Sequence, residues 1–238
     1  MNKKNKIDFR LEAQPQEGKT VIYLYGDIVD ERPIDYWTGE PLEGDYITPK
    51  EVRGLLDGIE DEKIELHINS YGGSVFASVA IFNYLKALNK DLTTINDGLC
   101  ASGASLIFMA GNKRIMPKNT VLMIHRASSY GWGNCNDLRE LADTLEKLDS
   151  STVYETDRTT FTGTDEEWSE IISGETWITA DESLSYGLCS EVAELGQKEP
   201  NEEPNKDPKE EPTNAEVNKG ISLMRNFANL KFKGELDK

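Results

Sequence analysis

The chain has 238 residues, with 43 acidic residues against 26 basic ones and a formal net charge of −17 at pH 7. This length is enough for one α/β domain of about 190–200 residues with its own core, followed by a tail. A surface so acidic repels nucleic acid and anionic membranes, so we expect neither as a partner. The three cysteines and two histidines lack metal-ligand spacing, so we expect no metal ion and no other cofactor.

No stretch of the sequence approaches the roughly 18 apolar residues of a membrane span. The basic N-terminus, residues 1–8, is not followed by the apolar stretch of a secretory signal. The cysteines are odd in number and widely spaced, which is typical of proteins with reduced thiols. These features together predict a cytoplasmic protein.

Strands and helices are predicted to alternate through residues 21–195. Apolar or alternating runs predict strands at 21–26, 64–68, 92–95, 121–125 and 188–192. Capping-box patterns predict helices that begin after Thr48, Thr164 and Thr179. Further helices are predicted after Ser74, near Ser102 and around the leucines of 138–148. Strands that alternate with helices form parallel βαβ units, so the expected fold class is α/β with a mostly parallel sheet.

The composition changes on both sides of this predicted α/β domain, 21–195. Residues 1–20 are assigned to an N-terminal extension. Prolines recur every four residues in 196–219, among acidic and lysine residues, which predicts a disordered, extended linker. The last segment, 220–238, is amphipathic, and its apolar face suits either docking to a partner or folding back on the chain's own domain.

A serine-containing turn, residues 98–105 (GLCASGAS), lies between an apolar strand and an apolar helix. Its small residues permit a sharp turn that presents the Ser102 hydroxyl, and the Gly103 amide at the helix N-terminus can stabilise an oxyanion. A serine hydroxyl is a weak nucleophile that needs an adjacent base. Ser105 and Cys100 are rival nucleophiles, and close helix packing is the alternative explanation of the small residues.

Two further segments offer the missing groups. Gly72-Gly73 precedes a helix, so its amides can approach a ligand closely, although such pairs also occur in plain tight turns. His125 ends an apolar strand and is the candidate base, with a structural histidine as the alternative. His67 lies on the polar side of its strand and is interpreted as a surface or interface residue.

A third group is needed to orient the imidazole and to stabilise its charged form. Glu175, in the segment ETWITA at 175–180, is the best candidate acid. Asp181 and Asp137 are alternative carboxylates, and an ordinary turn residue is the alternative role for Glu175.

Together these segments resemble the ClpP family of serine peptidases over about residues 21–193. The matching segments are the turn NSYGGS, the serine segment GLCASG, the strand end MIH and the acid segment ETWITA, at 69–74, 98–103, 123–125 and 175–180. The resemblance implies a ClpP/crotonase-type spiral of βαβ units with a protruding long helix at about 136–160. It also implies self-association into rings, stacked through that helix around an enclosed chamber.

The same resemblance assigns roles to individual residues. It implies Ser102 as nucleophile, His125 as base and Glu175 as acid, with the amides of Gly73 and Gly103 as the oxyanion hole.

Several residues depart from the family pattern: Tyr71 replaces proline, Gly103 replaces methionine, 126–127 replaces Gln-Pro, and Glu175 replaces aspartate. The sequence motifs around Ser102 and Glu175 resemble those of the ClpP-like peptidases of tailed phages and prophages, which act in head maturation. The expected function is therefore a serine endopeptidase that cleaves capsid or scaffold proteins, in the host cytoplasm or within a procapsid.

Four other functions remain open from the sequence. The first is a general Clp-type protease fed by a separate ATPase, because this chain has no P-loop. The second is a crotonase-type acyl-CoA enzyme, and the third is a Ser–Lys peptidase that uses Lys113 or Lys118. The fourth is a catalytically inactive capsid assembly factor.

Overall fold

The computed structural model describes residues 11–16, 18–153 and 157–194. The chain divides into two units, Met1–Gln197 and Lys198–Lys238, and all described residues belong to the first. The predicted linker at 196–219 and the amphipathic segment at 220–238 lie outside the described residues.

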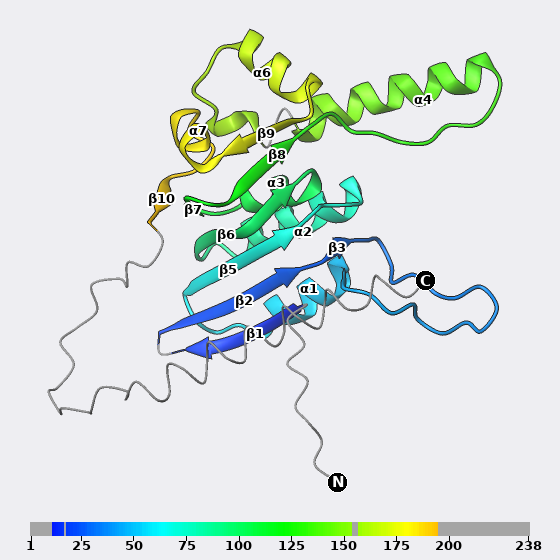
Figure 1. Ribbon diagram of the computed structural model, residues 1–238. Helices are drawn as coiled ribbons and strands as arrows, with labels where there is room; N and C mark the ends of the chain where they lie inside the picture. Colours follow the sequence, from blue (N-terminus) through cyan, green and yellow to red (C-terminus); the bar gives the residue numbers. More distant parts are fainter. Residues whose placement is uncertain (1–10, 17, 154–156, 195–238) are drawn as a thin grey trace, which may run out of the picture. The chain divides into compact units, whose positions relative to one another are not determined.

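An eight-stranded sheet runs through the first unit (Figure 1). Six of its strands lie in the order β1-β2-β5-β6-β7-β10, while β8 pairs with both β6 and β9. The β1–β2 and β8–β9 pairs are antiparallel and the other pairs are parallel, as the alternation of strands and helices predicted. The strands are β1 Leu11–Gln16, β2 Lys19–Tyr25, β5 Lys63–Ser70, β6 Asp91–Ala101, β7 Lys113–Pro117, β8 Val121–Ile124, β9 Thr176–Thr179 and β10 Glu191–Ala193.

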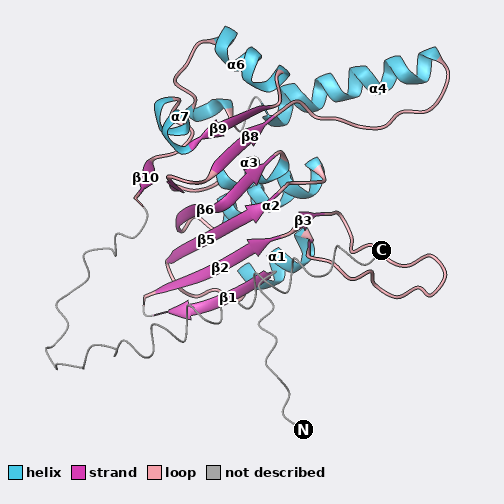
Figure 2. Cartoon of the chain, viewed as in Figure 1, coloured by secondary structure: helices cyan, strands magenta, loops and turns pink. Residues whose placement is uncertain are grey.

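Helices connect these strands, as the secondary-structure colouring of Figure 2 shows. A separate two-stranded sheet joins β3 (Asp27–Ile28) to β4 (Tyr46–Ile47). The α-helices are α1 Pro49–Leu56, α2 Val75–Ala87, α3 Gly103–Phe108, α4 Cys135–Leu148, α6 Asp165–Ser173 and α7 Ala180–Ser185. A π-helical turn, Asp149–Val153, and a 3-10 turn, Arg158–Thr160, follow α4.

The core lies between the sheet and the helices α1, α2 and α3, which cover one of its faces (Figure 1), and it extends to α6 through Trp168, Ile171 and Ile172. Strand β5 shows why: Ile64, Leu66 and Ile68 are buried, while Glu65 and His67 point to the other face and stay partly exposed. This is the alternation expected of a strand that is buried on one side.

The two halves of strand β6 pair with different strands, and this pairing positions the Ser102 turn. The first part of β6, Thr93–Ile95, pairs with β7, whereas Leu99–Ala101 pairs with β8. The strand therefore extends beyond the predicted end at Ile95, because β8 supplies a second partner for its last residues. The ends of β6 and β8 are brought side by side at the point where Ser102 and His125 follow.

Local capping signals are confirmed. Capping boxes begin α1, α6 and α7, as predicted from Thr48, Thr164 and Thr179. In each box the threonine hydroxyl accepts a hydrogen bond from the amide three residues later. The glutamate carboxylate at that later position accepts a hydrogen bond from the threonine amide.

Two boundaries differ from the sequence prediction. Residues 11–16 of the predicted N-terminal extension form β1, whose register pairs Leu11 with Leu24, so the sheet reaches further toward the N-terminus. The predicted long helix at 136–160 ends as an α-helix at Leu148. There, the buried Asp149 accepts hydrogen bonds from Arg126 Nε and the Ala127 amide, both at 2.6 Å, and this ties the end of the helix to the body.

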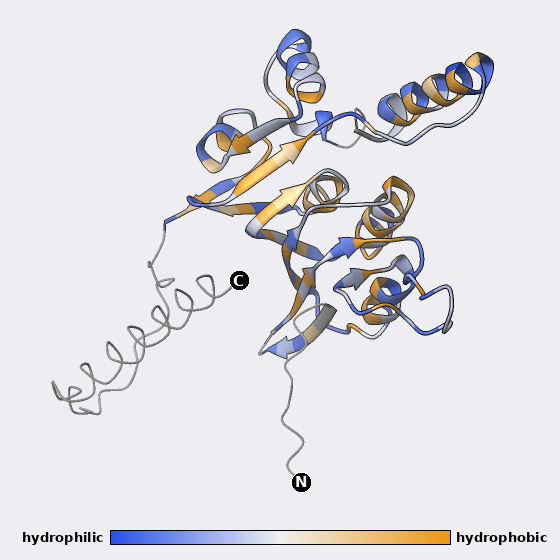
Figure 3. Cartoon of the chain, turned by 45° about the vertical axis from the view of Figure 1, so that its right-hand side comes forward, coloured by the Kyte–Doolittle hydropathy of each residue, from blue (hydrophilic) through white to orange (hydrophobic). Residues whose placement is uncertain are grey.

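Helix α4 extends away from the sheet, and none of its residues is buried (Figure 3). Polar and apolar residues alternate around it, and Leu138 is 46% exposed. Leu138 and Leu141 on its apolar side lie beside the loop at Gly131, so this side is only partly covered within the described part of the chain. Among the described helices, none is long and apolar enough to cross a bilayer.

Candidate active site

Ser102 occupies a sharp turn between β6 and α3. Its backbone has φ 54° and ψ −126°, a region that non-glycine residues rarely adopt. The turn is held because the Ser102 amide donates to the Met123 carbonyl at 2.9 Å, which continues the pairing of β6 with β8. Strained serines on strand-to-helix turns present their hydroxyl groups above a sheet, and this geometry is typical of serine nucleophiles.

The glycine pair packs directly against this turn. A Cβ atom on Gly72 would lie 2.5 Å from the Ala101 carbonyl oxygen and 2.9 Å from Ser102 Cβ, so only glycine permits the approach. Gly73 has φ 144° and bridges to Ile28, whose carbonyl would lie 2.0 Å from an added Cβ. Both glycines are therefore required by close backbone contacts.

Among the described residues, the main-chain amides of Gly73 and Gly103, next to the Ser102 turn, have no hydrogen-bond acceptor. The backbone bridge to Ile28 uses the Gly72 carbonyl and the Ser74 amide. The Gly73 amide between them takes no part in this bridge. The Gly103 amide is at the first position of α3, where helical geometry provides no acceptor. A Cβ on Gly103 would lie 3.6 Å from the Gly73 nitrogen, so the two amides are neighbours.

His125 meets the serine. Its Nε2 atom lies 2.7 Å from Ser102 Oγ, a short hydrogen bond between groups 23 residues apart in the chain. The imidazole is largely shielded, with 17% of its side chain exposed. The nucleophile and base predicted from the sequence are thus within hydrogen-bonding distance, as nucleophilic catalysis requires.

Glu175 approaches His125 but does not hydrogen-bond to it. The Glu175 Oε1 atom lies 3.9 Å from His125 Nδ1, and 73% of the Glu175 side chain is exposed. This separation is too long for a hydrogen bond, although it permits electrostatic attraction. Glu175 itself has φ 50° in the turn between α6 and β9.

The rival nucleophiles are placed differently. Cys100 is fully buried, and burial raises the pKa of its thiol well above the usual value, which disfavours the reactive thiolate. The Ser105 hydroxyl lies 2.7 Å from the Ser102 carbonyl and 3.0 Å from Asp157 Oδ2.

The rival bases and acids are also engaged elsewhere. Asp137 caps α4 by accepting from the Asn134 amide at 2.8 Å, and Asp181 lies exposed in the first turn of α7. Lys113 pairs with Glu191 at 2.6 Å and Lys118 with Glu194 at 3.4 Å.

His67 belongs to a polar network on the open face of the sheet. Its Nδ1 atom lies 2.8 Å from Asp97 Oδ1, its Nε2 atom lies 3.0 Å from Glu65 Oε1, and its ring stacks on Tyr23. This network lies on strands β2, β5 and β6 and does not line the pocket of Ser102.

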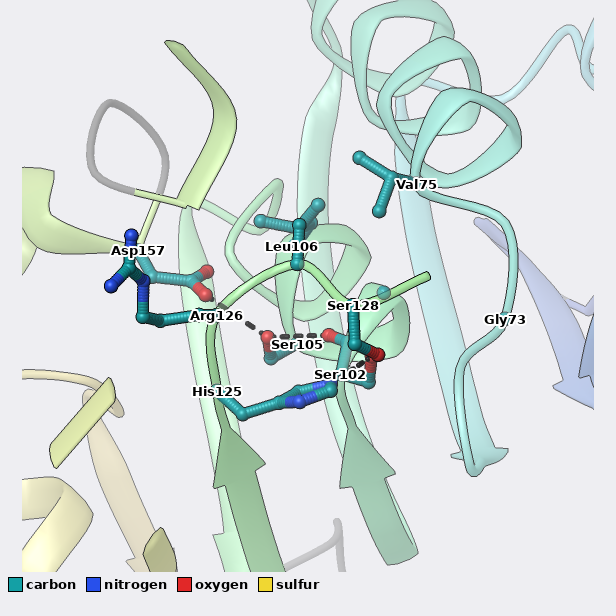
Figure 4. A pocket seen from close by; sticks show the side chains of 11 residues that line it. Gly73, Val75, Ser102, Ser105, Leu106, His125, Arg126, Ser128 and Asp157 are labelled. Atoms are coloured by element: carbon teal, nitrogen blue, oxygen red, sulfur yellow. Dashed lines mark hydrogen bonds between the residues drawn. The ribbon is translucent and has the colours of Figure 1, made fainter. Parts of the chain in front are cut away.

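A pocket of about 50 Å³ opens beside Ser102 and His125 (Figure 4). Its lining includes Val75 and Leu106 on its apolar side and Asp157 on its polar side. Asp157 was not singled out in the sequence, because one aspartate among 43 acidic residues carries no local signal of burial. Only the packing against α3 makes it a pocket residue.

Comparison with known proteins identifies the family of this chain. The family model described as Clp protease matches residues 50–196. The chain belongs to the Clp protease family. It is a serine-type endopeptidase with the α/β fold of Clp proteases.

Several Clp protease subunits are similar to this chain over most of their length. An ATP-dependent Clp protease proteolytic subunit of Bacteroides fragilis is 30% identical over 162 residues, which cover 67% of this chain and 74% of the relative. Proteolytic subunit 2 of Tropheryma whipplei is 27% identical over 177 residues, covering 71% and 94%. Proteolytic subunit 2 of Thermobifida fusca is 35% identical over 143 residues, covering 58% and 70%.

One departure from the Clp protease pattern has a structural reason. Gly103 stands where the resemblance suggested methionine, and a Cβ at this position would lie 2.2 Å from Ser78 Oγ. Ser78 is itself held by donating to the Ser74 carbonyl at 2.8 Å. The pair of a glycine at 103 and a serine at 78 lets α2 approach the Ser102 turn closely.

Proposed function

We propose that Ser102, His125 and Glu175 are the catalytic residues of this Clp-family peptidase, and that the Gly73 and Gly103 amides form its oxyanion hole. The observation that carries the proposal is the 2.7 Å contact of Ser102 Oγ with His125 Nε2. It is supported by the strained backbone of Ser102 and by the two free amides beside it.

Each group has one task in peptide hydrolysis. His125 takes the hydroxyl proton as Ser102 Oγ attacks the peptide carbonyl, and the new bond turns the carbonyl oxygen into an oxyanion. The Gly73 and Gly103 amides donate hydrogen bonds to that oxygen. His125 then protonates the leaving amine. Water attacks the acyl group as His125 takes its proton, and the bond from the carbonyl carbon to Ser102 Oγ breaks as His125 returns that proton to Oγ. Glu175 stabilises the imidazolium through the 3.9 Å contact.

The proposed substrates are capsid or scaffold proteins processed during phage head maturation. This proposal is supported by the sequence motifs at 98–105 and 175–180, which resemble those of the phage and prophage branch of ClpP-like peptidases. The polar tail at 196–219 suits that branch better than a housekeeping enzyme. The place of action would be the host cytoplasm or the inside of a procapsid.

A second candidate is a general Clp-type protease that works with a separate ATPase. The relatives named above are proteolytic subunits of ATP-dependent proteases, which favours this alternative. In either case we propose self-association into rings. The apolar side of α4 is the proposed contact between rings, because none of its residues is buried and Leu138 is 46% exposed.

Co-expression with a candidate phage capsid protein tests the proposal. Wild type is expected to shorten the capsid protein at a defined site without an added ATPase, and Ser102→Ala is expected to leave it intact. Ser185→Ala is the matched control, because Ser185 is an exposed serine at the end of α7. Intact mass spectrometry measures the length of the capsid protein after co-expression with wild type, Ser102→Ala or Ser185→Ala.

The outcomes separate the candidates. Cleavage that requires a Clp ATPase and ATP favours the general protease. Cleavage that persists in purified Ser102→Ala shows that the nucleophile is another residue.

A further inference from the structure

A buried carboxyl group lines the pocket beside the nucleophile. Asp157 is 1% exposed, and its Oδ2 atom lies 3.0 Å from Ser105 Oγ. The Ser105 hydroxyl in turn lies 2.7 Å from the Ser102 carbonyl oxygen, so one hydroxyl separates the carboxyl from the main chain of the nucleophile. Figure 4 shows the Asp157 carboxyl directed toward Ser105 from the side of the pocket opposite Val75.

This carboxyl group is only half satisfied. Within the described part of the chain, Asp157 Oδ1 has no hydrogen-bond donor, although it is buried. Burial raises the pKa of Asp157 to about 7, and the hydrogen bond with Ser105 lowers it only in part. A buried carboxyl with a free oxygen is costly in its charged form unless a cation or donor reaches it.

We infer that Asp157 is a specificity-determining residue that selects substrates with a basic side chain, lysine or arginine, immediately before the scissile bond. The inference rests on the proposed role of Ser102, because the acyl group that Ser102 would carry places this side chain in the same pocket. The ammonium or guanidinium group would donate to the Asp157 carboxylate and supply a charge partner for it.

The shape of the pocket suits such a side chain. Its volume of about 50 Å³ holds roughly four water molecules, at about 10–15 Å³ each. An unbranched lysine chain fits such a space better than an aromatic ring does. The apolar atoms of Val75 and Leu106 can contact the methylene groups, while the charged end reaches Asp157.

Arg126 also lines the pocket, and its charge must be considered. Its Nε atom lies 2.6 Å from Oδ2 of the buried Asp149, so its positive charge is already paired. Asp157 has no such partner among the described residues. Ionisation of Asp157 therefore adds one negative charge to the lining of this pocket.

Peptidyl phosphonate diphenyl esters test this inference directly. A reactive serine attacks phosphorus, an Oγ–P bond forms and phenol leaves, so intact mass reports the rate for each probe. Four probes differ only in the side chain that precedes the phosphonate: lysine, leucine, glutamine and glutamate. Wild type is expected to react at least about 30-fold faster with the lysine probe than with the leucine probe, as for a desolvated charge pair.

Asp157→Asn is expected to reduce this ratio to within about threefold, because the amide keeps the shape and loses the charge. Asp57→Asn is the matched control: it removes one charge from an exposed position paired with Arg53 on α1, and the ratio should stay unchanged. The wild-type series decides the question even if Asp157→Asn does not fold.

A simple fluorophosphonate without a peptide separates the two proposals. If it does not label Ser102, the proposed catalytic role is wrong. If it labels Ser102 but the lysine probe is no faster than leucine or glutamine, or the glutamate probe is fastest, the assignment of Asp157 is overturned. A lysine preference that survives in Asp157→Asn also overturns it.

Discussion

Glu175 lies directly opposite His125 at the open end of the β8–β9 pair, yet its carboxylate stops 3.9 Å from the imidazole. The register explains the placement, because Ile124 pairs with Thr176 and the next residues on each strand face one another. The exposure explains the distance: the Glu175 side chain is 73% exposed, so water competes with His125 for its oxygens. Glu175 is therefore positioned by the sheet but held loosely.

Loose placement predicts a modest role for the acid. Glu175→Gln is expected to lower kcat/KM by about tenfold, against about 10⁴-fold for removal of a buried triad aspartate. Asp181→Asn, at the rival position, should leave kcat/KM unchanged. Kinetics with a peptide ester check both variants, and a loss as large as that of Ser102→Ala would show that Glu175 closes onto His125 in the working enzyme.

The strained backbone of Ser102 predicts that two substitutions with the same effect on activity differ in their effect on stability. Ser102→Gly and Ser102→Ala should both abolish turnover, but glycine relieves the strain of φ 54° that alanine retains. Ser102→Gly should therefore be more stable than Ser102→Ala by about 1 kcal/mol. Urea unfolding at equal protomer concentration measures the difference, and equal stabilities would mean that the turn is unstrained.

The contact between Gly103 and Ser78 predicts a rescue. Gly103→Ala should destabilise the protein by about 1–3 kcal/mol, because the new methyl group meets Ser78 Oγ. Ser78→Ala removes that atom, so the double variant should recover part of the loss in a double-mutant cycle. Gly73→Ala meets the Ile28 carbonyl instead, and Ser78→Ala should not rescue it. Additive losses at 103 and 78 would disprove the contact.

The His67 network predicts a pH dependence of stability. Burial of the imidazole lowers its pKa, but hydrogen bonds with Asp97 and Glu65 outweigh this and raise the pKa to about 9. A raised pKa in the folded state means that the contribution is complete below about pH 6.5 and is lost as pH rises through 9.

The loss should amount to about 1–2 kcal/mol, since the network is partly exposed and screened by solvent. His67→Gln should flatten the free energy of unfolding between pH 6.5 and 9, and a variant with the wild-type slope would contradict this assignment.

Asp157 predicts a second pH effect, on specificity. Its pKa of about 7 means that the carboxyl is mostly neutral at pH 6 and mostly charged at pH 8. The ratio of the rates with the lysine and leucine phosphonates should therefore rise over this interval. His125 and Arg126 are the other titratable residues that line the pocket. His125 serves the reaction with both probes, so its contribution cancels in the ratio, and a pH-independent ratio would count against Asp157.

Much of this protein was predictable from local sequence, since local features depend on neighbours in the chain. The threonine capping boxes, the alternation in 64–68 and the small-residue turn around Ser102 each predicted a structure that is present. The pairing of Ser102 with His125 also followed from motifs at the ends of two predicted strands, which a parallel sheet brings to one edge.

The remaining features depend on contacts between distant segments. The distance from Glu175 to His125 depends on the β8–β9 register and on a side chain that stays in water. The early end of α4 depends on the buried Asp149, which accepts from Arg126 and Ala127. The burial of Asp157 arises only when it packs beside Ser105 on α3. The residue types determine which chemical groups are available. Burial and distance are properties of the packed chain, and they determine which carboxyl groups lie close enough to act with Ser102.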